Sequence, residues 1–404
     1  MKGVATRVGA RDITEEHRVS SSLELLFDLT FVVAIGSLVA QLAHAIGTDH
    51  AAESIGPFFM VFFAVWWAWN QFTWLASAYD SDDFAYRILT LVQMAGVLVL
   101  AAGVPSAFEN GNFLAGTIGY LIMRVGLVGN LVRVWVLDPE SRPSTQRYII
   151  GISVVQLGWL LSLALAQPGS VVPWFLVLAA AELLVSPWAD RAQPLPWHPH
   201  HIAERYGLFT IILLGESVLA VTLAVQVGVA DGVTVPLVGV AASGLVLLFS
   251  LWWLYFLEPA ADGLVKHRNR SYLWRYGHYF LYASLAAIGA GFEVAVAAIT
   301  QHLQASDMAV GFGVAIPVAS FLMLLWLLHI PIVDQVVIPP VATIIAAALI
   351  LVMPIAAPAV GLLAVAIAIT LVTAGLLGVA LSTQRTAARA DESLPEGRRG
   401  PSIS

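Results

Sequence analysis

An acidic run beside a cluster of tryptophans has residue types that can do chemistry. The run is Asp80-Ser81-Asp82-Asp83, and Arg87 follows it. Hard cations take oxygen ligands, so these carboxylates can hold Mg²⁺ against a phosphorylated substrate. A carboxylic acid in such a run can also donate its proton to an alkene. The run therefore predicts Asp80, Asp82 and Asp83 as catalytic residues and metal ligands, with Mg²⁺ as the expected cofactor.

The tryptophans just before the run are predicted to bind the apolar part of a substrate. They are Trp66, Trp67, Trp69 and Trp74. Aromatic faces attract cations, and they stabilise a carbocation in a dry pocket in the same way. A DxDD run protonates an alkene in class II terpene cyclases, so an isoprenoid diphosphate fits, with its head group near Arg87. The alternative is an acidic interfacial loop beside an aromatic belt, which is common in membrane proteins.

A second set of acids falls inside apolar segments. Glu24 and Asp28 are four residues apart and share one helical face. Glu204 opens a later segment, and Glu216 lies about 18 Å beyond it at 1.5 Å per residue. A carboxylate at that depth must be protonated, paired or in contact with water. We predict Glu24, Asp28 and Glu216 as catalytic or proton-handling acids, and a structural ion pair is the alternative.

The basic and imidazole groups in these segments are predicted to bind substrate. Arg124 lies in the middle of an apolar run, where its charge requires a carboxylate or an anionic substrate. Glu182 and Glu216 are the acids at similar depth, and Glu216 is the expected partner. Arg205, next to Glu204, is a second basic candidate. His278 is expected to line the same interior, and Glu204, Arg205 and His278 complete the predicted substrate-binding set.

The composition excludes several classes of protein. Of 404 residues 59% are hydrophobic and 11% are charged, and the mean hydropathy is +0.83. These values exclude an ordinary soluble domain. The chain has no cysteine, which removes disulfides, thiolate catalysis, iron–sulfur clusters and cysteine-based zinc sites. The expected partners are the lipid bilayer and a small hydrophobic or phosphorylated substrate, and no nucleic acid.

Apolar runs of about 20 residues, the length that crosses the hydrocarbon core, recur along the chain. They predict an all-α polytopic membrane protein of two parallel six-helix halves. Spans are expected near 23–45, 55–79, 86–105, 113–136, 147–167, 171–189, 204–227, 234–257, 276–300, 309–330, 336–356 and 358–382. The predicted parts are a cytoplasmic tail over 1–22, a first half over 23–190, a second half over 204–382 and a disordered cytoplasmic tail over 383–404. The segment 197–201 is interpreted as an interfacial loop.

The basic residues predict the orientation of these spans. All but Arg124 of the 19 Lys and Arg residues lie in the tails or at every second connection between spans. Cytoplasmic connections carry an excess of Lys and Arg, so both termini are predicted to be cytoplasmic.

The first helices of the two halves have similar sequences. ELLFDLTFVVAIGSLVA begins at Glu24 and ERYGLFTIILLGESVLA begins at Glu204. Each following span carries a Trp pair, Trp66–Trp67 in one half and Trp252–Trp253 in the other. Six helices per repeat keep both halves in the same orientation, which makes a parallel repeat about an axis along the membrane normal. Chance similarity between apolar helices is the alternative.

Three segments carry a resemblance to a known family. ELLFDLTFV, WWAWNQFTWLASAYDSDDFAYR and HHIAERYGLFTIILLGES together resemble the bacterial low temperature requirement A (LtrA) family. The resemblance implies a multi-pass protein of the bacterial plasma membrane, and it implies no reaction. Two functions stay open: an intramembrane enzyme acting on an isoprenoid or lipid-like substrate, and a proton-coupled secondary transporter with a buried carboxylate and Arg site.

Overall fold

The protein is almost entirely helical. The computed structural model describes residues 9–10, 20–80, 82–165, 167, 169–230, 232–300, 303–332 and 337–392. The helices are α1 (Ser22–Gly47), α2 (Ala51–Ala78), α3 (Phe84–Asn110), α4 (Leu114–Leu137), α5 (Arg142–Leu165), α6 (Val171–Asp190), α7 (Pro199–Ala230), α8 (Val235–Phe256), α9 (Ala260–Lys266), η1 (Arg268–Arg270), α10 (Ser271–Thr300), α11 (Asp307–His329), α12 (Pro340–Val352), η2 (Met353–Ala356), α13 (Ala357–Val360) and α14 (Leu362–Glu392). The two-residue strands β1 (Gly9–Ala10) and β2 (Tyr79–Asp80) pair antiparallel.

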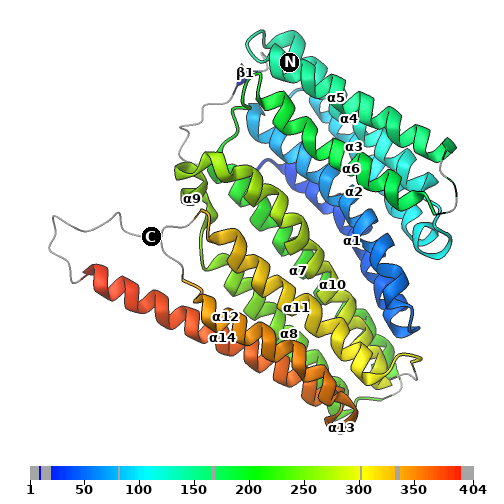
Figure 1. The fold of residues 1–404 in the computed structure, drawn as a ribbon, viewed down its shortest axis with the longest axis vertical. Helices are drawn as coiled ribbons and strands as arrows, with labels where there is room; N and C mark the ends of the chain where they lie inside the picture. Colours follow the sequence, from blue (N-terminus) through cyan, green and yellow to red (C-terminus); the bar gives the residue numbers. More distant parts are fainter. Residues whose placement is uncertain are drawn as a thin grey trace. The chain divides into compact units, whose positions relative to one another are not determined.

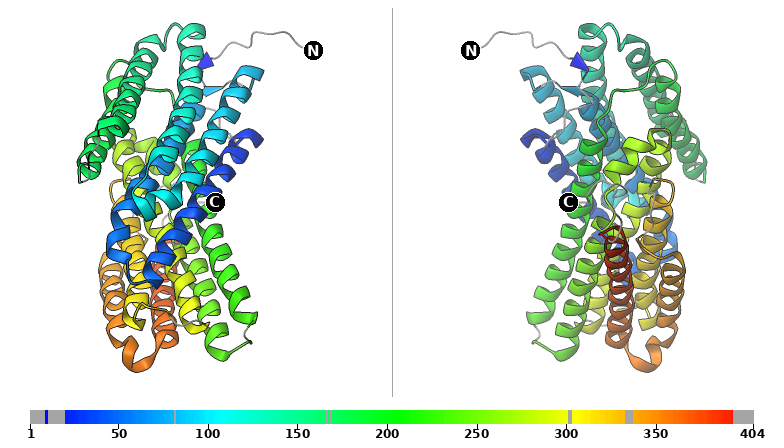
Figure 2. Two further views of the ribbon diagram at one scale, coloured as in Figure 1. Left: turned by 90° about the vertical axis from the view of Figure 1, so that its right-hand side faces the viewer. Right: turned by 90° about the vertical axis from the view of Figure 1, so that its left-hand side faces the viewer.

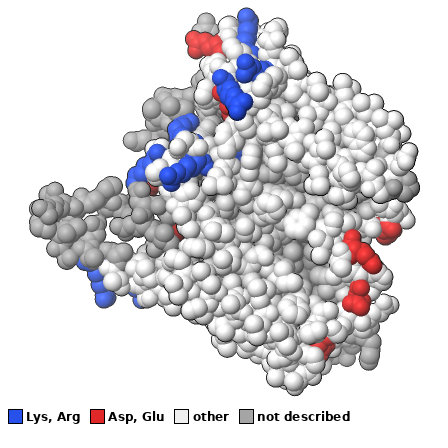
Figure 3. Space-filling view, in the orientation of Figure 1, with Lys and Arg blue, Asp and Glu red and all other residues white. Residues whose placement is uncertain are grey.

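The prediction of an all-α polytopic membrane protein is confirmed. In the described part of the chain, twelve helical segments are long and apolar enough to cross a membrane. Their mean hydropathies over the best window run from 1.4 to 2.5. The face in Figure 3 is uncharged over most of its area, as a lipid-facing surface requires.

The chain forms two compact units. Unit 1 comprises residues 1–42 and 50–212, and unit 2 comprises residues 43–49 and 213–404. In unit 1, α2 is the most enclosed helix along its second half, where every residue from Val65 to Ala78 is buried. The hairpin of α5 and α6 has the lowest buried shares, 22% and 28%, and lies at the edge of the unit (Figures 1 and 2).

Glycines set the closest helix pair of unit 1, which is α3 with α4. A Cβ on Gly119 would lie 2.6 Å from the carbonyl oxygen of Gly96, and it would also overlap the backbone of Leu100. Gly126 makes the same kind of approach to the carbonyl of Leu89. Small residues let two helix backbones come this close, which replaces the hydrophobic driving force that lipid cannot supply.

We predict that Gly119→Ala weakens this packing. The added methyl group meets backbone atoms, which cannot rotate away, so the loss should be about 1–3 kcal/mol of unfolding free energy. Gly116→Ala on the same helix is the matched control, because a Cβ there meets nothing within 4 Å. Unfolding in detergent measures both variants, and equal stability of the two would contradict the glycine contact.

Unit 2 is built on the pairs α10 with α11 and α8 with α14. Gly291 on α10 approaches the backbone of Gly313 on α11, so this pair also depends on glycine. α10 is the most enclosed spanning helix, with 72% of its best window buried. The chain turns from α12 to α14 through η2 and α13, and Gly361 adopts a positive φ of 83° at that turn.

Several boundaries differ from the sequence-based expectations. α7 begins at Pro199, a residue that suits the first turn of a helix because its missing N–H is not needed there. The segment 197–201 is therefore partly helical. α14 continues to Glu392, so residues 383–392 are helical instead of disordered, and 393–404 lie outside the described residues.

The two Trp pairs aligned between the halves lie in different surroundings. Trp66 and Trp67 are buried, whereas Trp252 and Trp253 are 45% and 47% exposed. The second pair therefore faces lipid or solvent, and the similarity between the halves does not extend to the environment of these side chains. The parallel repeat stays a prediction.

Candidate functional site

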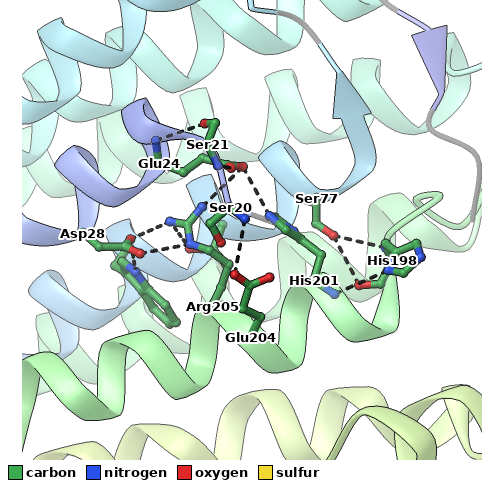
Figure 4. Close-up of polar contacts among 11 residues, drawn as sticks. Ser20, Ser21, Glu24, Asp28, Ser77, His198, His201, Glu204 and Arg205 are labelled. Carbon is green, nitrogen blue, oxygen red and sulfur yellow. Dashed lines mark hydrogen bonds and ion pairs between the residues drawn. The ribbon is translucent and has the colours of Figure 1, made fainter. Parts of the chain in front are cut away.

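A buried ion pair joins α1 to the first turns of α7 in unit 1. Asp28 accepts two hydrogen bonds from the guanidinium of Arg205, 3.0 Å from Nε and 2.5 Å from Nη2. Both side chains are almost inaccessible, at 1% and 0%. A bidentate contact of this kind matches the planar fork of Arg and fixes the two helices in register. Figure 4 shows Arg205 pointing from α7 toward Asp28 and Glu24 on α1.

Glu24 extends the network by one helical turn. Its Oε1 lies 3.4 Å from Arg205 Nη1 and 3.5 Å from His201 Nε2, and its Oε2 accepts a 2.7 Å hydrogen bond from the backbone N–H of Ser21. Glu24 and Asp28 are four residues apart on α1, and His201 and Arg205 are four apart on α7. Two acids on one face thus meet two basic groups on another (Figure 4).

Glu204 lies at the edge of this network. It accepts a 3.3 Å hydrogen bond from the backbone N–H of Ser20 and is only partly buried. His198 begins the same segment, and its Nδ1 lies 3.4 Å from the backbone N–H of His201. The loop side of the network is therefore tied to the first residues of α7 (Figure 4).

α2 completes the network with neutral donors. The indole N–H of Trp69 donates to Asp28 at 2.8 Å, so the carboxylate has three N–H donors. Asn70 and the indole of Trp74 both donate to the hydroxyl of Tyr206 on α7, at 2.5 and 3.2 Å. These contacts hold α2 against α7, and Trp69 adds a neutral donor to the Asp28 carboxylate.

A second buried network joins α2, α4 and α6 in unit 1. Arg124 on α4 lies 3.1 Å from Glu182 on α6, with the two side chains at 3% and 0% exposure. Glu182 also accepts a 3.0 Å hydrogen bond from Trp67 and a 3.2 Å bond from the hydroxyl of Tyr120. Arg124 donates to Gln71 at 2.5 Å and to Tyr120.

The prediction for the partner of Arg124 is confirmed in one part and wrong in the other. The prediction that Arg124 meets a buried carboxylate is confirmed, and the preference for Glu216 over Glu182 is wrong. Depth along the helices alone did not separate the two acids. Glu182 is the partner because α6 packs in the same unit as α4, and Trp67 and Gln71 on α2 each add a hydrogen bond to one of the two charges.

The acids of the DxDD run are used in local structure. Asp83 caps α3 by accepting a 2.9 Å hydrogen bond from the N–H of Tyr86, and it forms an ion pair with Arg133. Asp82 forms an exposed 2.7 Å ion pair with Arg87, and the hydrogen bond from Arg87 lowers the pKa of the Asp82 carboxyl. The Asp80 side chain and Ser81 lie outside the described residues.

We predict different stability effects for the two aspartates. Asp83→Ala removes an N-cap and an ion pair and should lower the unfolding free energy by about 1–2 kcal/mol. Asp82→Ala removes only an exposed pair and should change it by less than about 1 kcal/mol. Thermal unfolding of the two variants in one detergent makes the comparison. A larger loss for Asp82→Ala would contradict these roles.

The predicted tryptophans are fully enclosed. Trp66, Trp67, Trp69 and Trp74 are between 0% and 4% exposed. Trp67, Trp69 and Trp74 use their indole N–H groups as donors inside the two networks. No group of three or more His, Asp and Glu side chains within the described residues is placed to hold a metal ion, and Mg²⁺ stays a prediction.

Unit 2 holds the remaining predicted residues. His278 on α10 is buried, with Nδ1 2.7 Å from the carbonyl of Trp274 and Nε2 3.3 Å from the hydroxyl of Tyr255. Glu216 on α7 is 7% exposed, and among the described residues it has no ion pair or hydrogen bond from a side chain. Next to it, Ser217 packs against Gly289 of α10.

Sequence reasoning did not single out His201, Tyr120 or Tyr206 as functional residues. The matching spacing was a usable signal for His201, because Glu24/Asp28 and His201/Arg205 both repeat at four residues. Tyr120 stands four residues before Arg124 and was available by the same reasoning.

Comparisons with known proteins give a family and no solved structure. The family model for the bacterial low temperature requirement A protein (LtrA) matches residues 19–380. An uncharacterized protein of Rhizobium meliloti (strain 1021) is 28% identical over 298 residues, which cover 67% of this chain and 69% of that protein. No solved structure matches the chain. Since the family model covers most of the chain, this multi-pass membrane protein belongs to the bacterial low temperature requirement A (LtrA) family.

Proposed function

We propose that this LtrA-family protein is a proton-coupled secondary transporter, and Glu216 is the observation that carries the proposal. Glu216 lies inside a helix long enough to span the membrane, is 7% exposed and has no counter-ion among the described residues. A carboxylate in that position is unfavourable, so the group must take up a proton or meet water. Acids of this kind mark proton pathways in pumps and transporters.

The pairing of the acids buried in α1 and α6 strengthens this assignment. Asp28 and Glu24 face Arg205, and Glu182 faces Arg124. Each of these carboxylates has a buried guanidinium beside it, so the pair contributes to structure. Glu216 differs from these acids because no such partner fixes its charge. We therefore assign the proton-handling role to Glu216.

The intramembrane enzyme has less support from the site. A proton donor to an alkene must be protonated, whereas the hydrogen bond from Arg87 lowers the pKa of Asp82. Asp83 is occupied by the cap of α3 and by Arg133. The tryptophans offered as a carbocation pocket donate hydrogen bonds in closed networks instead.

The proposed setting is the bacterial plasma membrane with both termini in the cytoplasm. The support is the distribution of Lys and Arg, which lie in the tails and at alternate connections. The cytoplasmic placement of the termini is part of the proposal. A proton gradient across this membrane would supply the driving force.

The test is transport by the purified protein in proteoliposomes that contain a pH-sensitive dye. An acid-outside gradient is imposed and a panel of small apolar and amphipathic compounds is added. We predict that at least one compound drives proton entry, that an uncoupler abolishes its accumulation, and that Glu216→Gln removes the proton entry. Glu53→Gln, at an exposed carboxylate, is the matched control and should behave like the wild type.

Two outcomes would contradict the proposal. One is uptake that continues unchanged after the gradient is collapsed, or that survives Glu216→Gln with its proton entry intact. The other is the absence of proton entry with every compound together with a new lipid product when the protein meets prenyl diphosphates and Mg²⁺. That second result would support the intramembrane enzyme.

A further inference from the structure

Unit 1 contains a cavity of about 300 Å³ among the helices α2 to α6. Its walls come from the first half of α2, the end of α3, the start of α4, the end of α5 and the start of α6. The residues Gly111–Phe113, which connect α3 to α4, stand at one end of it. Pockets for small ligands begin at roughly this size.

The lining selects for an uncharged ligand. None of the lining residues is Asp, Glu, Lys, Arg or His. The inner wall is aromatic, with ring centroids of Phe63 and Trp159 each 5.6 Å from that of Phe175, and Tyr120 6.5 Å from Trp159. Asn112 and Thr117 lie toward the α3–α4 connection and supply polar groups at that end.

The aromatic wall of the cavity contacts the second buried network, which contains Arg124 and Glu182. Tyr120 lines the cavity with its ring, and its hydroxyl contacts both Arg124 and Glu182. Phe63 stacks on Trp67 at 6.1 Å, and Trp67 donates to Glu182. A ligand that displaces Tyr120 or Phe63 would therefore disturb a buried ion pair.

We infer that this cavity binds a small, uncharged amphipathic molecule, with its apolar body against the aromatic wall and a polar end near Asn112 and Thr117. Naming this molecule as the transported substrate rests on the proposed function, whereas the binding itself does not. The absence of charged lining groups disfavours ions and phosphorylated compounds, because a buried charge would have no partner.

This site is separate from the DxDD run. Leu100 lines the cavity and lies 17 residues after Asp83 on α3, which is roughly 25 Å along the helix at 1.5 Å per residue. A diphosphate held at the acidic run would thus leave the cavity to a different molecule or to a distant part of a long chain.

Photolabelling with benzophenone tests the cavity directly. Benzophenone is small and uncharged, carries one acceptor carbonyl, and inserts into nearby C–H bonds under ultraviolet light. The full chain in nanodiscs is irradiated at increasing probe concentration and the labelled residues are mapped by mass spectrometry. We expect saturable labelling of residues on the aromatic wall and non-saturable labelling of lipid-facing residues such as Leu157, which is 59% exposed.

A filling variant supplies the control. A Cβ on Gly116 meets nothing within 4 Å and this residue lines the cavity, so Gly116→Leu should place its side chain in the cavity. It should weaken saturable labelling by at least about tenfold, which corresponds to about 1.4 kcal/mol of binding free energy, since the added side chain takes the volume that the ligand would occupy. Gly56→Leu, at an exposed glycine that also has open space, should label like the wild type.

The arms of the experiment separate the sources of the ligand. Bilayer phospholipids bring ester carbonyls, so nanodiscs of ether-linked lipid are compared with nanodiscs of ester-linked lipid. Equal labelling in both assigns the cavity to a free small molecule, and stronger labelling in ether lipid assigns it to a lipid carbonyl. Saturable labelling unchanged in Gly116→Leu, or only non-saturable labelling in the wild type, overturns the site. Neither result depends on a proton gradient or on Glu216.

Discussion

Arg205→Gln is expected to lower the unfolding free energy by about 3–5 kcal/mol, because it leaves buried carboxylates without their cation. Arg205 is fully buried and faces both Asp28 and Glu24, so its loss affects two acids at once. SDS-induced unfolding in mixed micelles, followed by circular dichroism, measures the change. Arg87→Gln, which removes the exposed partner of Asp82, should lose less than about 1 kcal/mol.

The double variant Arg205→Gln/Asp28→Asn identifies the cause. If the loss comes from an uncompensated charge, neutralising Asp28 should restore part of the stability that Arg205→Gln removes. A double-mutant cycle for residues in one network should then give a coupling of about 0.5–3 kcal/mol. Strict additivity of the two single changes would contradict a charge pair and leave only lost packing.

Arg124→Gln is expected to have the next largest effect, again about 3–5 kcal/mol when only one partner is removed. Glu182 would then keep two neutral donors, Trp67 and Tyr120, but no cation. Arg124→Gln/Glu182→Gln should recover much of the loss, since no buried charge remains. The same unfolding assay measures the single and double variants.

A different result would assign Arg124 to the ligand. If Arg124→Gln leaves the unfolding free energy unchanged but abolishes transport, the guanidinium acts on substrate instead of on Glu182. Tyr120→Phe separates the two cases further, because it keeps the ring in the cavity and removes only the hydroxyl that touches Arg124 and Glu182.

The helices were predictable because the membrane imposes a simple length rule. Each apolar run of about 20 residues forms one spanning helix, since the backbone must satisfy its own hydrogen bonds in lipid. The ends were less predictable. Polar residues at helix ends are compatible with either a helix or a loop, so the sequence did not show that α7 begins at Pro199 or that α14 continues to Glu392.

The site was predictable only in part, because its pairs join distant helices. Asp28 and Arg205 were both identified as functional candidates, yet 177 positions separate them and no local pattern states that they meet. Glu182 and Glu216 have similar predicted depths, so hydropathy alone could not assign the partner of Arg124. The DxDD run illustrates the converse, since a motif suited to catalysis serves as a helix cap at Asp83.

The protonation state of Glu216 tests the central claim most directly. Infrared difference spectra of the reconstituted protein, recorded between acid and neutral pH, report carboxyl groups that gain or lose a proton. We predict a carboxyl band in the wild type that is absent from Glu216→Gln and retained in Glu53→Gln. Identical difference spectra for the wild type and Glu216→Gln would show that this buried acid keeps one protonation state, and they would contradict its role as the proton site.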